Sequence, residues 1–257
     1  MLTPPEIARS LLAAGESKAR LPFGKMLLLA ILAGAYIALA GVGATAAAVT
    51  VESGSLAKLL SACVFPAGLS MVILAGSELF TGNCLMVMAL LERRITPVQL
   101  LRNWLTVYLG NAVGGAAVAA LAVYSHTASL FGDGLARSMV SIAESKAALG
   151  AGDAFLRGVL CNFLVCLAVW MAAASKRAEG KVIALFFPIL LFVLCGYEHC
   201  IANLYYLPAG AFAAAEYGVE TTLTLAGCLK NLAAVTLGNL VGGAALGVGY
   251  RFAYLKE

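Results

Sequence analysis

Charged residues are scarce in this chain of 257 residues. They make up 12% of the chain, against about 25% in typical soluble domains, and 62% of its residues are hydrophobic. The mean hydropathy is +0.94. This composition excludes a soluble globular domain and predicts a protein that crosses a membrane several times. The net charge of +4 is spread over the segments between apolar runs, so it predicts no nucleic-acid partner.

The chain also has only two histidines, and its seven cysteines form no Cys-x-x-Cys pair. A cysteine and histidine metal centre would need an unusual ligand set, so we expect no metal and no cofactor. A membrane-embedded redox enzyme is the alternative from another class. However, His126 in a polar segment and His199 at the predicted midplane lie too far apart to share a cofactor. No nucleophile with a neighbouring base is evident, so we expect a protein that is not an enzyme.

Long apolar runs are abundant, and they predict an all-α polytopic membrane protein with six transmembrane helices. The chain begins with a polar stretch that contains Thr3-Pro-Pro-Glu6, the pattern of a helix N-terminus. We therefore expect an interfacial helix at residues 1–24 and no cleaved secretory signal. The whole chain, 1–257, is interpreted as one transport domain, with halves at 25–126 and 154–257 and an external connection at 127–153. The six predicted spans cover residues 25–51, 56–91, 98–124, 154–174, 182–215 and 222–250.

The fifth of these apolar runs is too long for one straight crossing. As a continuous helix, residues 182–215 would extend about 50 Å, whereas the hydrocarbon core of a bilayer is about 30 Å thick. Near its middle stands Gly196-Tyr-Glu-His-Cys-Ile-Ala-Asn203, with the only two residues of the run that could carry charge. Irregular backbone at membrane depth survives only where protein or a water-filled cavity covers it. We therefore predict a break at Glu198–Asn203, next to a permeation path.

The same pattern occurs in the first half of the chain. Gly76-Ser-Glu-Leu-Phe-Thr-Gly-Asn83 aligns with Gly196–Asn203, and the Leu-Gly-Asn-x-Val-Gly-Gly motif that ends at Gly115 recurs ending at Gly243. Phe-Pro precedes both breaks, at 65–66 and at 187–188. These landmarks predict two related halves, inverted with three spans each, and a second break at Glu78–Asn83. Paired interruptions of this kind indicate the binding site of a transporter.

The positive-inside rule predicts the orientation of the bundle. Twelve basic residues fall on one predicted side and five on the other, so both termini are expected to be cytoplasmic. The twelve are Arg9, Lys18, Arg20, Lys25, Arg93, Arg94, Arg102, Lys176, Arg177, Lys181, Arg251 and Lys256, and the five are Lys58, Arg137, Lys146, Arg157 and Lys230.

Several motifs together resemble the formate/nitrite transporter family, which also has hydrosulfide and lactate-type members. They are Glu78-Leu-Phe-Thr81, Asn103-Trp-Leu-x-Val-Tyr-x-Gly-Asn111, Cys161-Asn-x-Leu-Val-Cys-Leu-Ala-Val-Trp170, Gly196-Tyr-Glu-His-x-x-Ala-Asn203 and Gly238-Asn239, and they cover nearly the whole chain. The resemblance implies an aquaporin-like protomer with its own pore, assembled with membrane lipid into a homopentamer. The expected location is the bacterial inner membrane.

The resemblance also assigns expected roles to individual residues. His199 resembles the central pore histidine, and Thr81 the threonine that hydrogen-bonds it. Lys146 resembles a lysine near the outer vestibule, although an ordinary loop lysine paired with Glu144 is the alternative. We expect Glu198 to fix the broken helix. Polar residues flanking the chamber are Asn162 and Asn239, and the expected hydrophobic constrictions are Phe65, Leu69, Leu79 and Phe192.

These expectations predict a channel or transporter for small monovalent anions of weak acids. Formate is the first choice, and nitrite or hydrosulfide, carried by members of the same family, are the alternatives. Such an anion crosses an apolar constriction far more easily as its neutral acid, and a histidine has a reference pKa near 6.5. His199 either gives the proton or orients the substrate while water does so. A water or glycerol channel would carry Asn-Pro-Ala at the breaks, which this chain lacks.

Overall fold

All described residues, 1–255, belong to helices or to the short segments that join them in the computed structural model. No strand occurs in that range, which confirms the predicted all-α class. Lys256, which the charge count grouped with Arg251, lies outside the described residues. The elements are α1 (Pro4–Ala19), α2 (Phe23–Ala48), α3 (Gly54–Val64), α4 (Pro66–Ala75), α5 (Phe80–Asn83), η1 (Cys84–Met86), α6 (Val87–Leu91), α7 (Pro97–Tyr124), η2 (Thr127–Ser129), α8 (Gly134–Ala148), α9 (Ala151–Ala173), α10 (Ala178–Leu194), α11 (Cys200–Tyr217) and α12 (Leu225–Tyr254).

Five helical runs are long and apolar enough to cross a membrane, and the chain is an integral membrane protein. The shortest run, Gly54–Ala75, contains both α3 and α4, which meet at Pro66, a residue without a backbone N–H. α10 has 17 residues and stays below that length, so the count of six spans remains a prediction. The five runs are Phe23–Ala48, Gly54–Ala75, Pro97–Tyr124, Ala151–Ala173 and Leu225–Tyr254.

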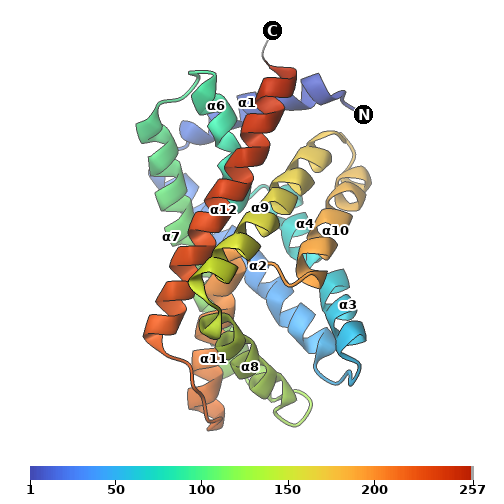
Figure 1. Cartoon of the computed structure of the whole chain (residues 1–257), viewed down its shortest axis with the longest axis vertical. Helices are drawn as coiled ribbons and strands as arrows, with labels where there is room; N and C mark the ends of the chain where they lie inside the picture. Colours follow the sequence, from blue (N-terminus) through green and yellow to red (C-terminus); the bar gives the residue numbers. More distant parts are fainter. Residues whose placement is uncertain (256–257) are drawn as a thin grey trace.

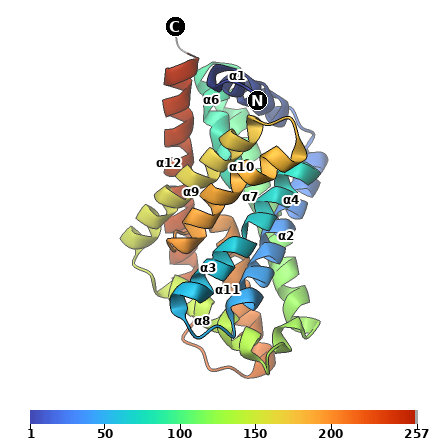
Figure 2. The same ribbon diagram turned by 90° about the vertical axis from the view of Figure 1, so that its right-hand side faces the viewer.

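The two ends of the chain lie at one end of the molecule, which we call the terminal end (Figure 1, top). The backbone N–H of Leu2 donates to the Ala174 carbonyl at 2.8 Å, and Arg251 forms an ion pair with Glu92 at 2.7 Å. These contacts bring the α6–α7 and α9–α10 connections to the terminal end as well. Helices α3, α8 and α11 reach the opposite end, which we call the α8 end (Figures 1 and 2).

The two halves of the chain repeat the same helix packing. Gly114 of α7 lies so close to α2 that a Cβ there would overlap the Ile31 carbonyl oxygen, and Gly242 of α12 has the same relation to Val159 of α9. Gly242 and Val159 come 128 residues after Gly114 and Ile31 in the chain. α2 runs away from the terminal end whereas α9 runs toward it, so the halves are inverted relative to each other.

The short helices α1 and α8 belong to this repeat. Ala8-Arg-Ser10 and Glu16-Ser-Lys-Ala19 of α1 recur in α8 as Ala136-Arg-Ser138 and Glu144-Ser-Lys-Ala147. The predicted connection at 127–153 is therefore largely a helix, the counterpart of the N-terminal one. The charged residues of this segment led to its interpretation as a polar connection. Its apolar residues Leu135, Met139 and Val140, however, are buried at helical spacing.

The helix breaks lie earlier in the chain than predicted. α4 and α10 give way to Gly76 and Gly196, which have φ of 79° and 69°, a left-handed conformation that glycine adopts without strain. Helix resumes at Phe80 and Cys200. The prediction that the breaks extend to Asn83 and Asn203 is therefore wrong, because the asparagines already lie in α5 and α11.

Candidate functional site

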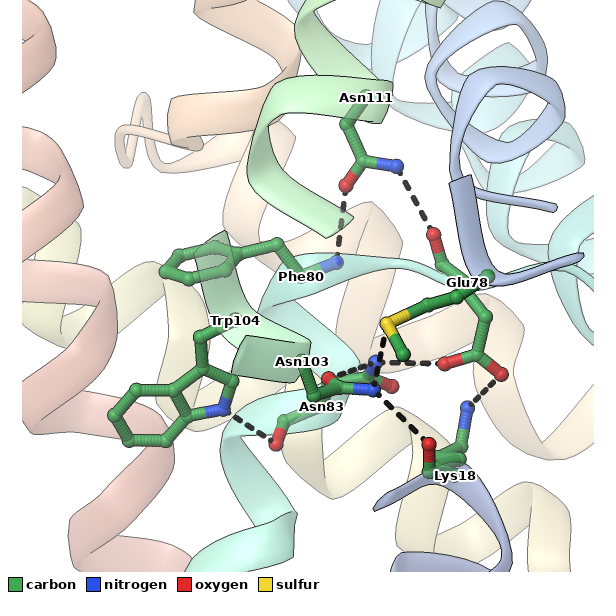
Figure 3. A network of polar contacts seen from close by, with 8 residues as sticks. Lys18, Glu78, Phe80, Asn83, Asn103, Trp104 and Asn111 are labelled. Carbon is green, nitrogen blue, oxygen red and sulfur yellow. Dashed lines mark hydrogen bonds and ion pairs between the residues drawn. The ribbon is translucent and has the colours of Figure 1, made fainter. Parts of the chain in front are cut away.

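The two non-helical segments are held by a pair of equivalent asparagines. The Asn111 amide of α7 donates to the Ala30 carbonyl at 2.7 Å. It also donates to the Glu78 carbonyl at 2.9 Å and accepts the N–H of Phe80 at 3.0 Å (Figure 3). Asn239 of α12 makes the same three bonds in the second half, to the carbonyls of Gly158 and Glu198 and from the N–H of Cys200, at 2.8, 2.9 and 2.9 Å. Each asparagine thus satisfies backbone groups that the break leaves without helical partners.

The breaks end at Leu79 and His199, which occupy equivalent positions as the N-caps of α5 and α11. The His199 ring accepts the Ala202 N–H at its Nδ1 (3.1 Å), and its Nε2 lies 2.9 Å from the Thr81 hydroxyl oxygen. Because Nδ1 accepts a hydrogen bond, the neutral ring carries its proton on Nε2, which donates to Thr81. The ring thus joins the two halves with a fixed tautomer and a defined donor.

The His199 ring borders a small, almost wholly apolar chamber. Its volume is about 10 Å³, close to the least that holds one water molecule. All four predicted constriction residues line it and are 3–4% exposed. Of the described lining residues, His199 alone has an ionisable side chain. The lining consists of Ile37, Phe65, Leu69, Leu79, Val165, Ile189, Phe192 and His199.

A much larger cavity, which we call the vestibule, lies beyond the chamber toward the α8 end. Its volume is about 570 Å³, and α2, α3, α8, α9, α10 and α11 contribute to its wall. Phe65, Phe192 and His199 line both cavities. The two phenylalanine rings meet edge to face, with centroids 5.6 Å apart, so they separate the vestibule from the chamber.

Lys146 and Glu198 form an ion pair in the vestibule wall. The Lys146 Nζ lies 2.9 Å from Glu198 Oε1 and 5.3 Å from the centre of the Tyr206 ring, and the two paired side chains are 15% and 6% exposed. Glu198 Oε2 accepts from Asn203 at 2.6 Å. Glu198 therefore fixes the start of α11 to α8, and Lys146 lies in the last turn of a helix and not in a loop.

Glu144, the alternative partner of Lys146, makes different contacts. It accepts the backbone N–H of Thr222 at 2.6 Å and the hydroxyl of Thr221 at 2.9 Å, which ties α8 to the α11–α12 connection. These hydrogen bonds, the Thr222 N–H first among them, lower the pKa of the Glu144 carboxyl. The carboxylate is engaged away from the vestibule.

The first half of the chain contains a matching ion pair, which was not predicted from the sequence. Lys18 of α1 lies 2.7 Å from Glu78, whose other oxygen accepts from Asn83 at 2.7 Å, and Asn83 also donates to Asn103 at 2.9 Å (Figure 3). Lys146, Glu198, Asn203 and Asn231 repeat this network. The detectable signal was the Glu-Ser-Lys-Ala motif shared by α1 and α8.

Asn162 lies behind Thr81, outside both cavity walls. Its amide donates to the Thr81 and Asn239 carbonyls, at 3.2 and 2.7 Å, and the Cys166 thiol lies 3.3 Å from the same Thr81 carbonyl. Asn162 and Asn239 are fully buried and engage backbone groups. Their amides thus bind backbone groups next to Thr81 and His199. Among residues 1–255, no three side chains of His, Cys, Asp or Glu are grouped to hold a metal ion.

Comparison with known proteins relates this geometry to a family. A family model described as "Formate/nitrite transporter" matches residues 5–253. The chain is 39% identical to the "Probable formate transporter" of Methanothermobacter thermautotrophicus, across 99% of this chain and 98% of the relative. It is 40% identical to the "Formate channel FocA" of Haemophilus influenzae, across 86% and 84% of the two chains. A solved "Pentameric formate channel with formate bound" is similar, with a TM-score of 0.81 and 32% identity over 91% of this chain and 98% of that one. These relatives are named as transporters and channels, which confirms the expectation that the chain is not an enzyme.

Proposed function

Because the chain belongs to the formate/nitrite transporter family, we propose that it conducts a small monovalent anion of a weak acid, formate first, through a pore that passes His199. The observation that carries the proposal is the order of the cavities. A polar vestibule is followed by paired phenylalanine rings and then by an apolar chamber with a histidine in its wall. The printed names of the relatives support formate as the substrate.

The chemistry of the proposed passage follows from desolvation. An unpaired carboxylate that leaves the vestibule for the chamber loses several kcal/mol of hydration, whereas its neutral acid loses much less. The His199 Nε2–H is a hydrogen-bond donor at the edge of the chamber, and it reaches substrate by releasing Thr81. Thr81 then stabilises the ring when the substrate has passed. The neutral Nε2–H thus holds the anion while a proton from the water of the vestibule neutralises it, and His199 keeps its own proton.

The assembly and orientation are part of the same proposal. We place five copies around one axis, with a pore in each, because the similar solved structure is described as pentameric. We place the terminal end in the cytoplasm of a bacterial cell, since the arginine and lysine residues of the α6–α7 and α9–α10 connections gather there. Native mass spectrometry that finds a monomer in mild detergent would refute the pentamer.

Substitution of His199 tests the proposed pore. The chamber is apolar, so His199→Phe should fold, keep the pentamer and lose formate uptake into proteoliposomes or change its selectivity among anions. The matched control is His126→Asn, which removes the other histidine at an exposed position with φ of 59° that asparagine tolerates. If His199→Phe shows the formate flux and the pH dependence of the parent, the histidine has no part in conduction.

A further inference from the structure

The vestibule contains more positive charge than its Lys146–Glu198 ion pair can explain. Lys58 of α3 and Arg157 of α9 line the same cavity. Within the described part of the chain, neither has a carboxylate oxygen within ion-pair distance, whereas the Lys146 charge is compensated by Glu198 at 2.9 Å. Lys146, Glu198 and Arg157 all lie near enough to Lys58 for their charges to interact with it. The excess charge of the vestibule therefore comes from Lys58 and Arg157.

The charge of Arg157 is not part of the scaffold that the two halves share. Arg157 stands where the first half has Leu29, since their carbonyls accept the N–H groups of Glu198 and Glu78 at 3.3 and 3.2 Å. The paired lysines and asparagines around the breaks recur in both halves, but this arginine does not. Scaffold geometry thus does not require a cation at position 157.

The part of the vestibule wall that α8 forms offers hydroxyl groups. Ser138, Ser141 and Ser145 follow one another at helical spacing on α8, and all three line the vestibule. Ser145 donates to the Ser141 carbonyl at 2.8 Å. The residue of α1 that corresponds to Ser141 in the repeat is Ala13. With a volume of about 570 Å³, the cavity has room for a small anion together with some of its water.

We propose that Lys58 and Arg157, with the Ser138 and Ser141 hydroxyls, form an anion-binding antechamber that captures a small hydrated carboxylate or oxyanion before it loses its water between Phe65 and Phe192. The inference rests on the proposed function and assigns capture to these residues, in place of the compensated Lys146. Clefts lined by charge of one sign raise the local concentration of counter-ions and their entry rates by tenfold or more.

Neutralisation of the two cations tests the antechamber. Lys58→Met combined with Arg157→Met should lower formate uptake roughly tenfold at subsaturating formate and low ionic strength. The half-saturating concentration should rise while the maximal flux stays close to that of the parent, because translocation past His199 is untouched. The loss should shrink in 1 M salt, where the Debye length falls to about 3 Å. Lys58→Arg keeps the charge and should behave like the parent.

A matched control separates capture in the cavity from general surface charge. Lys230→Met removes an exposed cation of α12 outside the vestibule wall and should leave uptake unchanged. If the double variant takes up formate like Lys230→Met at low salt, the antechamber is refuted while the proposed function stands. If the parent itself takes up no formate, nitrite or hydrosulfide, the proposed function fails, and that result is visible before any variant is compared.

Discussion

At the scale of single residues, the buried carboxylates Glu78 and Glu198 determine much of the architecture. Each binds one lysine and one asparagine in the same geometry, and each lysine comes from a short helix packed at one end of the molecule. A buried charge is tolerated only when it is paired and hydrogen-bonded. The two networks therefore hold α1 and α8 against the non-helical segments that contain Glu78 and Glu198.

Removal of the lysine from one ion pair should show how much the stability of the protein depends on that pair. Lys146→Met leaves the Glu198 charge unpaired at 6% side-chain exposure and should cost about 3 kcal/mol of stability. The double variant Lys146→Met with Glu198→Gln should recover most of that loss, because no charge is left buried alone. Thermal unfolding of the detergent-solubilised protein measures both. A Lys146→Met variant as stable as the parent would show that the ion pair does not hold α8.

At the scale of helices, the sequence predicted an all-α chain but not how the two helix breaks are held. Repeated Gly-x-Glu motifs revealed both breaks, because glycine and a buried glutamate are local features of the chain. Their end points depend on Asn111 and Asn239, whose bonds to Phe80 and Cys200 cross 31 and 39 residues. The Lys18–Glu78 pair spans 60 residues, so the composition of either segment alone gave no indication of it.

Close packing of α12 on α9 gives a prediction for a helix pair. A Cβ at Gly242 would overlap the Val159 carbonyl oxygen, so Gly242→Ala should force the helices apart and cost about 1–3 kcal/mol. Gly249 lies in the same helix with open space where its Cβ would stand, so Gly249→Ala should be neutral or slightly stabilising. Unfolding midpoints of the two variants compare them directly. Equal loss in both would mean that glycine content, and not contact with α9, matters here.

At the scale of the whole molecule, two inverted halves share one scaffold but differ where substrate would pass. His199 stands where the first half has Leu79, and Arg157 where it has Leu29. The sequence motifs predicted the repeat and the histidine, since both are visible in the alignment of the halves. The resemblance implied an outer vestibule near Lys146, but its full wall could not be predicted, because six helices from both halves contribute to it. Under the proposed function, the substrate meets the positions at which the two halves differ.

The most direct test of the account is the selectivity of the protein in proteoliposomes. Vesicles that contain the wild-type chain are mixed with formate, nitrite or hydrosulfide salts, and with a neutral polyol such as glycerol, while light scattering follows their swelling. A polar, cationic vestibule in front of an apolar chamber with His199 predicts rapid swelling in at least formate and none above the empty-vesicle rate in glycerol. Swelling in glycerol as fast as in formate, or no swelling in any of the three salts, would contradict the account.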